Sequence, residues 1–185
     1  QGENRAIEAY GELIKISLID GEQMWNKIKS IKKINYEVMW KLLKPAIEAK
    51  YKVVMKDPFE KKGIRQILNL GHTLGHALES GLNIPHGIAV NYGLQFALEW
   101  GVHAGITDRK YITFPFAKST MSAVKDGWLG AKNYSLIAKA INRDKKKSSD
   151  NLVNFIFVKS PGKTVVKEVS VLDIMQELRR QNVGF

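Results

Sequence analysis

The sequence predicts a mainly helical domain with a small β hairpin near its C-terminus. Apolar residues recur at three- and four-residue spacing through most of the first hundred positions, which is typical of amphipathic helices. Two β-prone segments, 152–158 and 164–169, are separated by Pro161-Gly162, which indicates a hairpin. The chain shows no internal repeat and no low-complexity segment. We therefore expect a single domain over residues 1–185.

The N-terminal third is expected to be mostly helical, over about residues 5–55. Asn35 is a plausible N-cap for a helix within it, and Pro45 should kink that helix or mark its restart. Residues 64–80 give the strongest helical pattern, and 81–86 should form a loop. Three further helical features follow: a helix over about 87–104, a second over 134–142, and a last helix capped by Ser170.

The composition limits the chemistry that the chain can carry. With 185 residues, 44% hydrophobic and 25% charged, it can bury a sizeable core. It contains no cysteine, which excludes disulfides, Cys-ligated zinc and a thiol nucleophile. There is no long apolar run and no apolar secretory signal, so we expect a cytoplasmic protein without a membrane partner. The first residue is Gln1 rather than Met, which suggests a fragment, a processed product or a domain.

The chain is strongly basic, with a formal net charge of +11 and a pI near 9.7. Such a charge is the first sign of a nucleic-acid-binding protein. The lysines are scattered, however, and no aromatic-interleaved basic ribbon accompanies them. We therefore expect no nucleic-acid partner. The densest basic cluster, 143–147, either lies at a solvated helix end or binds a small phosphorylated substrate.

A polar stripe runs through the predicted helix 64–80. Arg65, Asn69, His72 and His76 would fall within an arc of roughly 60° on a continuous helix, since each residue turns about 100°. The other faces are apolar, so the helix should be buried, and its polar stripe should need partners, a ligand or a metal. A satisfied core network, or a stripe that faces water, is the alternative. Four polar groups on one stripe favour a functional site.

Two histidines do not complete a metal site, because a catalytic zinc normally takes three protein ligands. His86, after Pro85 and at the expected start of a helix, is the natural additional candidate. Glu12 can supply a carboxylate, although spacing alone does not choose it over Glu8 or Glu79. The alternative is that Glu12 has no functional role and forms an exposed ion pair with Lys15. The fourth histidine, His103, is interpreted as structural.

Residues 63–79 resemble the signature of the 3-dehydroquinate synthases. Further matching segments follow the order of that family: 11–15, then Lys50 with Asp57, then 86–90, and finally the Asp-Lys-Lys of 144–146. The resemblance covers residues 8–147. The segment from Arg65 to His86 is highly specific, whereas the shorter motifs gain weight from their order.

The resemblance implies roles for individual residues. Glu12, His72 and His86 would hold Zn²⁺ or another divalent metal such as Co²⁺. His76 would lie beside the substrate and take part in proton transfer, and Lys15 would also act on the substrate. The groups expected to hold the substrate's phosphate, carboxylate and hydroxyls are Lys15, Lys50, Arg65, Asn69, His76 and one of Lys145 and Lys146, with Lys146 preferred.

The family's substrate is a phosphorylated seven-carbon keto-acid sugar of the shikimate pathway, from which phosphate is eliminated before an internal aldol closure. NAD is used transiently and binds to an N-terminal domain, for which this sequence shows no Gly-rich strand-turn-helix. We therefore expect the isolated chain to be inactive and to bind NAD poorly. The NAD-binding domain is the implied partner, and a homodimer is expected from the resemblance.

Two departures from the family pattern leave the substrate open. Ile88 stands where the family usually has Glu, and one extra residue separates Asp57 from Arg65. Another sugar-phosphate cyclase is therefore an alternative, as is a degenerate domain kept as a binding partner. A metal-dependent alcohol dehydrogenase relative would explain the histidines but not Lys15, Arg65 and Asn69. A basic nucleic-acid or interaction module would leave the histidines structural.

Overall fold

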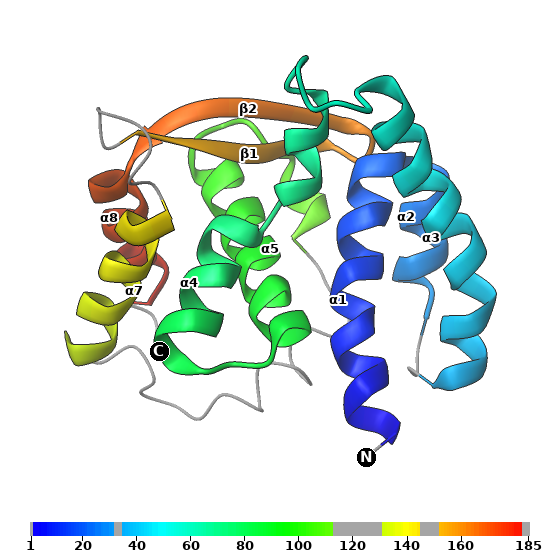
Figure 1. Ribbon diagram of the computed structural model, residues 1–185, viewed down its shortest axis with the longest axis horizontal. Helices are drawn as coiled ribbons and strands as arrows, with labels where there is room; N and C mark the ends of the chain where they lie inside the picture. The colour runs from blue at the N-terminus through cyan, green and yellow to red at the C-terminus, as the bar shows by residue number, and fades with distance from the viewer. Residues whose placement is uncertain (1, 32–34, 113–130, 145–151, 183–185) are drawn as a thin grey trace.

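The computed structural model describes residues 2–31, 35–112, 131–144 and 152–182. The α-helices are α1 (Gly2–Asp20), α2 (Glu22–Lys29), α3 (Tyr36–Lys56), α4 (His72–Leu82), α5 (His86–His103), α7 (Ala131–Asp144) and α8 (Val171–Asn182). Figure 1 shows the N-terminal helices α1, α2 and α3 on one side, α4 and α5 at the centre, and α7 and α8 on the other side, with the hairpin lying across their ends. The mainly helical fold with a C-terminal hairpin is therefore confirmed.

The remaining elements are short. Two 3₁₀ helices, η1 (Ile64–Asn69) and η2 (Arg109–Tyr111), follow α3 and α5. Strands β1 (Leu152–Ser160) and β2 (Lys163–Ser170) pair antiparallel, with Ile156 opposite Val166. None of the helices in the described part of the chain combines the length and the apolarity that a membrane span needs.

Local signals in the sequence predicted several of these elements. The side chain of Asn35 accepts a hydrogen bond from the Val38 amide at 2.9 Å, which caps α3 as expected. Pro45 lies within α3, and the helix continues to Lys56. Ser170 and Asp173 exchange hydrogen bonds at the start of α8, which confirms the last helix.

Helix α5 is the centre of the fold, and it is buried over most of its length. Its residues Phe96 and Trp100 contact Phe155 on β1, with ring centroids 5.9 and 4.8 Å apart. Helices α1 and α4 both pack on α5. At Gly11 on α1, an added Cβ would lie 2.5 Å from the carbonyl oxygen of Gly87 on α5. Only a residue without a side chain allows this approach, and it sets Glu12 beside the start of α5.

The prediction of one continuous helix over 64–80 is wrong. The chain forms η1, leaves the helical conformation at Leu70, and turns at Gly71, where φ is 77°. Such a left-handed conformation favours glycine. The turn is also packed tightly, because a Cβ on Gly71 would lie 2.9 Å from the amide nitrogen of Leu94. His72 and His76 therefore share a face of α4, whereas Arg65 and Asn69 belong to a separate element.

The position of η1 is fixed by Asp57, the residue that follows α3. Its carboxylate is 2% exposed and accepts hydrogen bonds from the backbone amides of Lys61, Lys62 and Ile64 at 2.9–3.1 Å. Burial by itself raises the pKa of Asp57, but these amide donors outweigh it and hold the pKa below its ordinary value. Asp57 thus anchors the connection that carries Arg65.

Candidate metal and substrate site

Glu12, His72 and His86 come together from three helices. Glu12 lies within α1, and the two histidines are the first residues of α4 and α5. Glu12 Oε1 lies 3.5 Å from His72 Nε2 and 3.8 Å from His86 Nε2. One ligand atom from each residue lies within 4.8 Å of the others. We call this set the metal triad; two nitrogens and one carboxylate oxygen are a donor set that suits a zinc-like ion.

The Nδ1 atoms of His72 and His86 both have hydrogen-bond partners. His72 Nδ1 lies 3.1 Å from the carbonyl oxygen of Leu70, and since that oxygen can only accept, Nδ1–H donates. His86 Nδ1 lies 2.9 Å from Glu79 Oε2. Both contacts leave the Nε2 atoms directed at Glu12. Metal-ligating histidines in proteins are usually oriented by such a bond on the other ring nitrogen.

The two oxygens of Glu12 have different surroundings. Glu12 Oε2 forms an ion pair with Lys15 Nζ at 2.7 Å. Glu12 Oε1 is buried and has no hydrogen-bond partner among the described residues. Burial by itself raises the pKa of Glu12, but the charges of Lys15, His72 and His86 outweigh it and lower that pKa. A buried anionic oxygen without a donor is costly, so the position suits a cation.

His72 is held neutral, and Lys15, which lies beside the triad, is paired with Glu12. Burial, together with the charge of Lys15, lowers the pKa of His72 to about 4, so the ring is neutral at pH 7. Its Nε2 lone pair is therefore available for a metal. Lys15 is only 4% exposed. Burial also lowers the pKa of Lys15, against the attraction of Glu12, and the charge of Lys50 acts in the same direction as burial.

His76 lies one turn further along α4 and is exposed. Its ring centroid is 5.0 Å from that of His72 and 6.0 Å from that of His86. His76, Glu79 and His86 form a second group whose ligand atoms lie within 4.8 Å of one another. Glu79 is the residue whose role sequence reasoning missed. Its spacing of three from His76 and seven from His86 was the available signal, and the loop between α4 and α5 brings it to His86.

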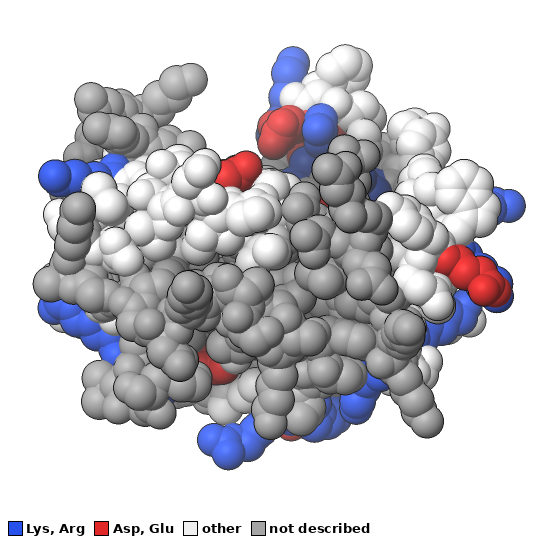
Figure 2. All heavy atoms as spheres, turned by 90° about the horizontal axis from the view of Figure 1, so that it is seen from below, with Lys and Arg blue, Asp and Glu red and all other residues white. Residues whose placement is uncertain are grey.

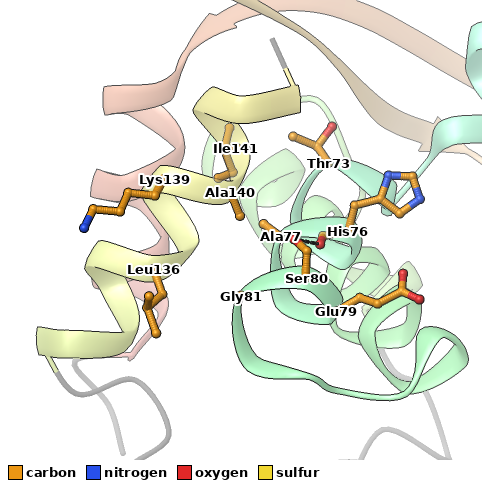
Figure 3. A pocket seen from close by; sticks show the side chains of 10 residues that line it. All are labelled: Thr73, His76, Ala77, Glu79, Ser80, Gly81, Leu136, Lys139, Ala140 and Ile141. Atoms are coloured by element: carbon orange, nitrogen blue, oxygen red, sulfur yellow. Dashed lines mark hydrogen bonds between the residues drawn. The ribbon is translucent and has the colours of Figure 1, made fainter. Parts of the chain in front are cut away.

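A pocket of about 560 Å³ opens beside His76, between α4 and α7. Figure 3 shows Thr73, His76 and Ser80 on the α4 side and Leu136 and Lys139 on the α7 side. The side chains of His76 and Glu79 lie close together at one side of the view. The pocket thus places a histidine of the site next to open space that is large enough for a small molecule.

The other predicted substrate residues that the structure describes lie on α3 and η1. Lys50 on α3 is exposed, and Asn69 on η1 is exposed. The Arg65 guanidinium donates to the carbonyl of Pro58 at 3.3 Å, while its Nε is buried without a hydrogen-bond partner among the described residues. The expected contributions of Lys145 and Lys146 lie outside the described residues, as does the side chain of Glu8.

His103 lies apart from these groups, at the end of α5. Its Nδ1 is 3.0 Å from Glu177 Oε2, so it joins α5 to α8, as expected of a structural residue. Glu177 is 4% exposed and also accepts from Arg180 Nε at 2.8 Å.

The family model and two curated relatives that match this chain all carry the name 3-dehydroquinate synthase. Residues 9–147 match the family model described as 3-dehydroquinate synthase C-terminal. The 3-dehydroquinate synthase of Pyrobaculum aerophilum is 35% identical over 125 residues, which cover 66% of this chain and 35% of that protein. The bifunctional shikimate kinase/3-dehydroquinate synthase of Thermotoga maritima is 29% identical over 176 residues, which cover 94% of this chain and 35% of that protein.

Among solved structures, a 2-deoxy-scyllo-inosose synthase complexed with carbaglucose-6-phosphate, NAD⁺ and Co²⁺ has the same fold. It superposes with a TM-score of 0.72 at 20% identity, over 97% of this chain and 52% of that protein. The chain spans about a third of the length of the curated relatives that it matches. Since the family model covers most of the chain, the chain belongs to the 3-dehydroquinate synthase C-terminal family.

Proposed function

We propose that this chain is the metal- and substrate-binding part of a 3-dehydroquinate synthase, a carbon–oxygen lyase of aromatic amino acid biosynthesis by the shikimate pathway. The observation that carries the proposal is the metal triad beside Lys15, with Glu12 Oε1 buried and lacking a hydrogen-bond donor among the described residues. A cytoplasmic location fits this role.

The residues present fit a divalent ion, and we propose Zn²⁺ or Co²⁺ held by Glu12, His72 and His86. A bound ion of this kind supplies a Lewis acid that polarises a substrate oxygen. The neutral ring of His72 and the anionic Glu12 are already in the protonation states that ligation requires. Lys15 stays beside Glu12, where it can contact the substrate as well as the carboxylate.

The remaining residues bind and orient the substrate in this proposal. Lys50, Arg65 and one of Lys145 and Lys146 neutralise the phosphate and the carboxylate, since charge-assisted hydrogen bonds to such groups are the strong ones. Asn69 bonds a hydroxyl. His76 exchanges a proton with the substrate from its exposed position next to the pocket. NAD is held by a separate nucleotide-binding domain, on which turnover depends.

A second candidate is a related sugar-phosphate cyclase with another substrate. Ile88 favours it, because the residue two positions after His86 is apolar and packs against the core, where the family's acidic residue would add a charge. The fold shared with 2-deoxy-scyllo-inosose synthase is compatible with either candidate.

Ligand affinities measured by titration calorimetry distinguish the two candidate functions. The Co²⁺-loaded chain should bind the phosphorylated seven-carbon keto acid, and carbaglucose-6-phosphate should bind more weakly. The opposite order would favour the second cyclase. The Arg65→Ala variant should lose affinity for the acid but keep Co²⁺. A chain that binds neither Co²⁺ nor Zn²⁺ would contradict both candidates and favour structural histidines.

A further inference from the structure

His86 belongs to two groups of metal-ligating side chains. With Glu12 and His72 it forms the metal triad. With His76 and Glu79 it forms a second group whose ligand atoms also lie within 4.8 Å of one another, and we call this group the outer set. Both groups offer two imidazole nitrogens and one carboxylate oxygen, so they suit the same divalent ions.

The two groups meet different nitrogens of the His86 ring. Nε2 lies 3.8 Å from Glu12 Oε1, and Nδ1 lies 2.9 Å from Glu79 Oε2. An ion held by either group therefore uses one ring nitrogen and leaves the other for a hydrogen bond to a carboxylate. Because a neutral imidazole carries one proton, that proton changes nitrogen through water when the ion changes group, with no net gain or loss. One neutral ring thus serves the two groups in turn.

Helix α4 joins the two groups along one face. His72, His76 and Glu79 are spaced four and three residues apart, so their side chains follow one another along the helix. The ring centroid of His86 lies 5.5 Å from that of His72 and 6.0 Å from that of His76. His86 therefore faces both histidines from the start of α5. An ion that moves along this row passes from one imidazole to the next within about one helical turn.

The outer set is the more accessible of the two groups. His76 is exposed, and the side chain of Glu79 is 43% exposed. In the metal triad, the side chain of His72 is 12% exposed, and Glu12 Oε1 is buried. His76 and Glu79 also line the pocket of about 560 Å³ between α4 and α7, and Figure 3 shows their side chains close together. A hydrated ion that enters this pocket meets the outer set first.

The basic surface makes the point of entry matter. The chain carries a formal net charge of +11, and Figure 2 shows Lys and Arg side chains along most borders of the face viewed from below. A cation is repelled over much of such a surface, so local carboxylates decide where it can approach. Glu79 provides a carboxylate at the outer set, in contact with His86.

Positive charge also opposes entry from the α1 side of the metal triad. Lys15 on α1 is buried beside the triad, and Lys50 on α3 is close enough for its charge to act on Lys15. Two ammonium groups in this position repel an approaching cation. On the pocket side, Lys139 lines the α7 wall, but in Figure 3 its side chain points away from α4. The pocket is therefore the more favourable approach.

We propose that the outer set is the entry site for the divalent ion of the metal triad, an inference that rests on the proposed metal site itself. The ion first binds His76, Glu79 and the Nδ1 atom of His86. It then passes to Nε2 of the same ring, to His72 and to Glu12. There it meets Glu12 Oε1, which has no hydrogen-bond partner among the described residues. The outer set holds the ion only in passage, because its exposed ligands compete with water.

Stopped-flow mixing of the full metal-free chain with Co²⁺ tests the proposal, with the visible absorption of bound Co²⁺ as the signal. The parent's uptake rate should level off at high Co²⁺ concentration, since filling of the outer set precedes transfer. Even a hydrogen-bond partner of a metal ligand is worth about tenfold in affinity, so His76→Ala should slow uptake about tenfold or more at low Co²⁺ concentration. Release to a chelator should slow by the same factor. The equilibrium dissociation constant should therefore stay unchanged, which a merely structural effect would not produce.

Two further variants make the test specific. Ser80→Ala is the matched control, because Ser80 is an exposed residue of the same helix and the same pocket but offers no imidazole or carboxylate. It should take up Co²⁺ at the parent's rate. His76→Glu exchanges one ligand for another and should recover most of the rate that His76→Ala loses. Circular dichroism confirms that each variant is folded.

The results that contradict the proposal differ from one another. A parent chain that binds no Co²⁺ overturns the proposed metal site and the entry site with it. Binding by His76→Ala with the parent's affinity and the parent's rates overturns the entry site alone. A His76→Ala variant whose affinity falls because Co²⁺ leaves faster also overturns it, since His76 would then be a resident ligand of the ion.

Discussion

Glu79 and His86 are joined by a hydrogen bond of 2.9 Å between Oε2 and Nδ1, on the side of the imidazole ring that faces away from Glu12. The bond fixes the rotation of the ring and directs Nε2 at Glu12 Oε1, 3.8 Å away. Glu79 is therefore a positioning residue for the metal triad, and it contributes from the last turns of α4 to a ligand on α5.

Replacing Glu79 with alanine should weaken metal binding without abolishing it. Loss of such an outer partner costs about 10- to 100-fold in metal affinity in other proteins, and we expect an effect of that size. Titration calorimetry with Zn²⁺ gives the measurement. Glu168→Ala, which removes an exposed carboxylate from β2, is the control and should leave the affinity unchanged. Equal affinities of the Glu79 variant and the parent would show that the bond does not orient His86.

Alanine at His72 and at His76 should have different effects. His72→Ala removes a member of the triad and should abolish specific Co²⁺ binding. His76→Ala should keep the metal and lower the affinity for the phosphorylated keto acid. The visible absorption of bound Co²⁺ reports the first effect and calorimetry the second. If His76→Ala loses the metal while His72→Ala keeps it, the ion sits on His76, Glu79 and His86 instead.

The pKa of Asp57 gives a pH-dependent prediction. Because the folded-state pKa is lowered, the ionised carboxylate stabilises the fold above its unfolded pKa of about 3.9. That contribution is lost as pH falls through the lower folded value. Asp57→Asn should therefore reduce the urea midpoint at pH 7, and the difference from the parent should shrink below about pH 4. A difference that stays constant down to pH 3 would contradict this role of the charge.

Gly71, in the turn before His72, and Gly105, after α5, provide a matched pair of glycine variants. Gly71 and Gly105 both have positive φ, at 77° and 68°, but only Gly71 has close neighbours. Gly105→Ala should cost about 1–2 kcal/mol of unfolding free energy from conformation alone. Gly71→Ala should cost more, since its Cβ would lie 2.9 Å from the Leu94 amide, and it should also displace His72. Denaturant unfolding and Co²⁺ affinity test both effects, and equal losses for the two variants would argue against the close packing.

Local signals in the sequence predicted most of the helices and the hairpin, because caps and turns such as Asn35 and Pro161-Gly162 act over a few residues. The break at Gly71 was missed, since periodicity does not reveal a positive φ that tertiary packing demands. Arg65 and Asn69 were consequently placed on the wrong face. The choice of Glu12 came from resemblance rather than spacing, because a contact across 60 residues depends on how α1 meets α4.

The close approach of Gly11 to Gly87 has a consequence for how this site can vary. Neither residue has a side chain, yet the distance between their helices decides whether Glu12 reaches His86. In a mutational scan scored by metal retention, Gly11 should therefore tolerate as little change as a ligand does. A scan scored by overall folding should register a cost at Gly11 as well, because the added Cβ would meet a backbone carbonyl at 2.5 Å. Positions that score low in both scans without offering a ligand atom would be those that supply clearance.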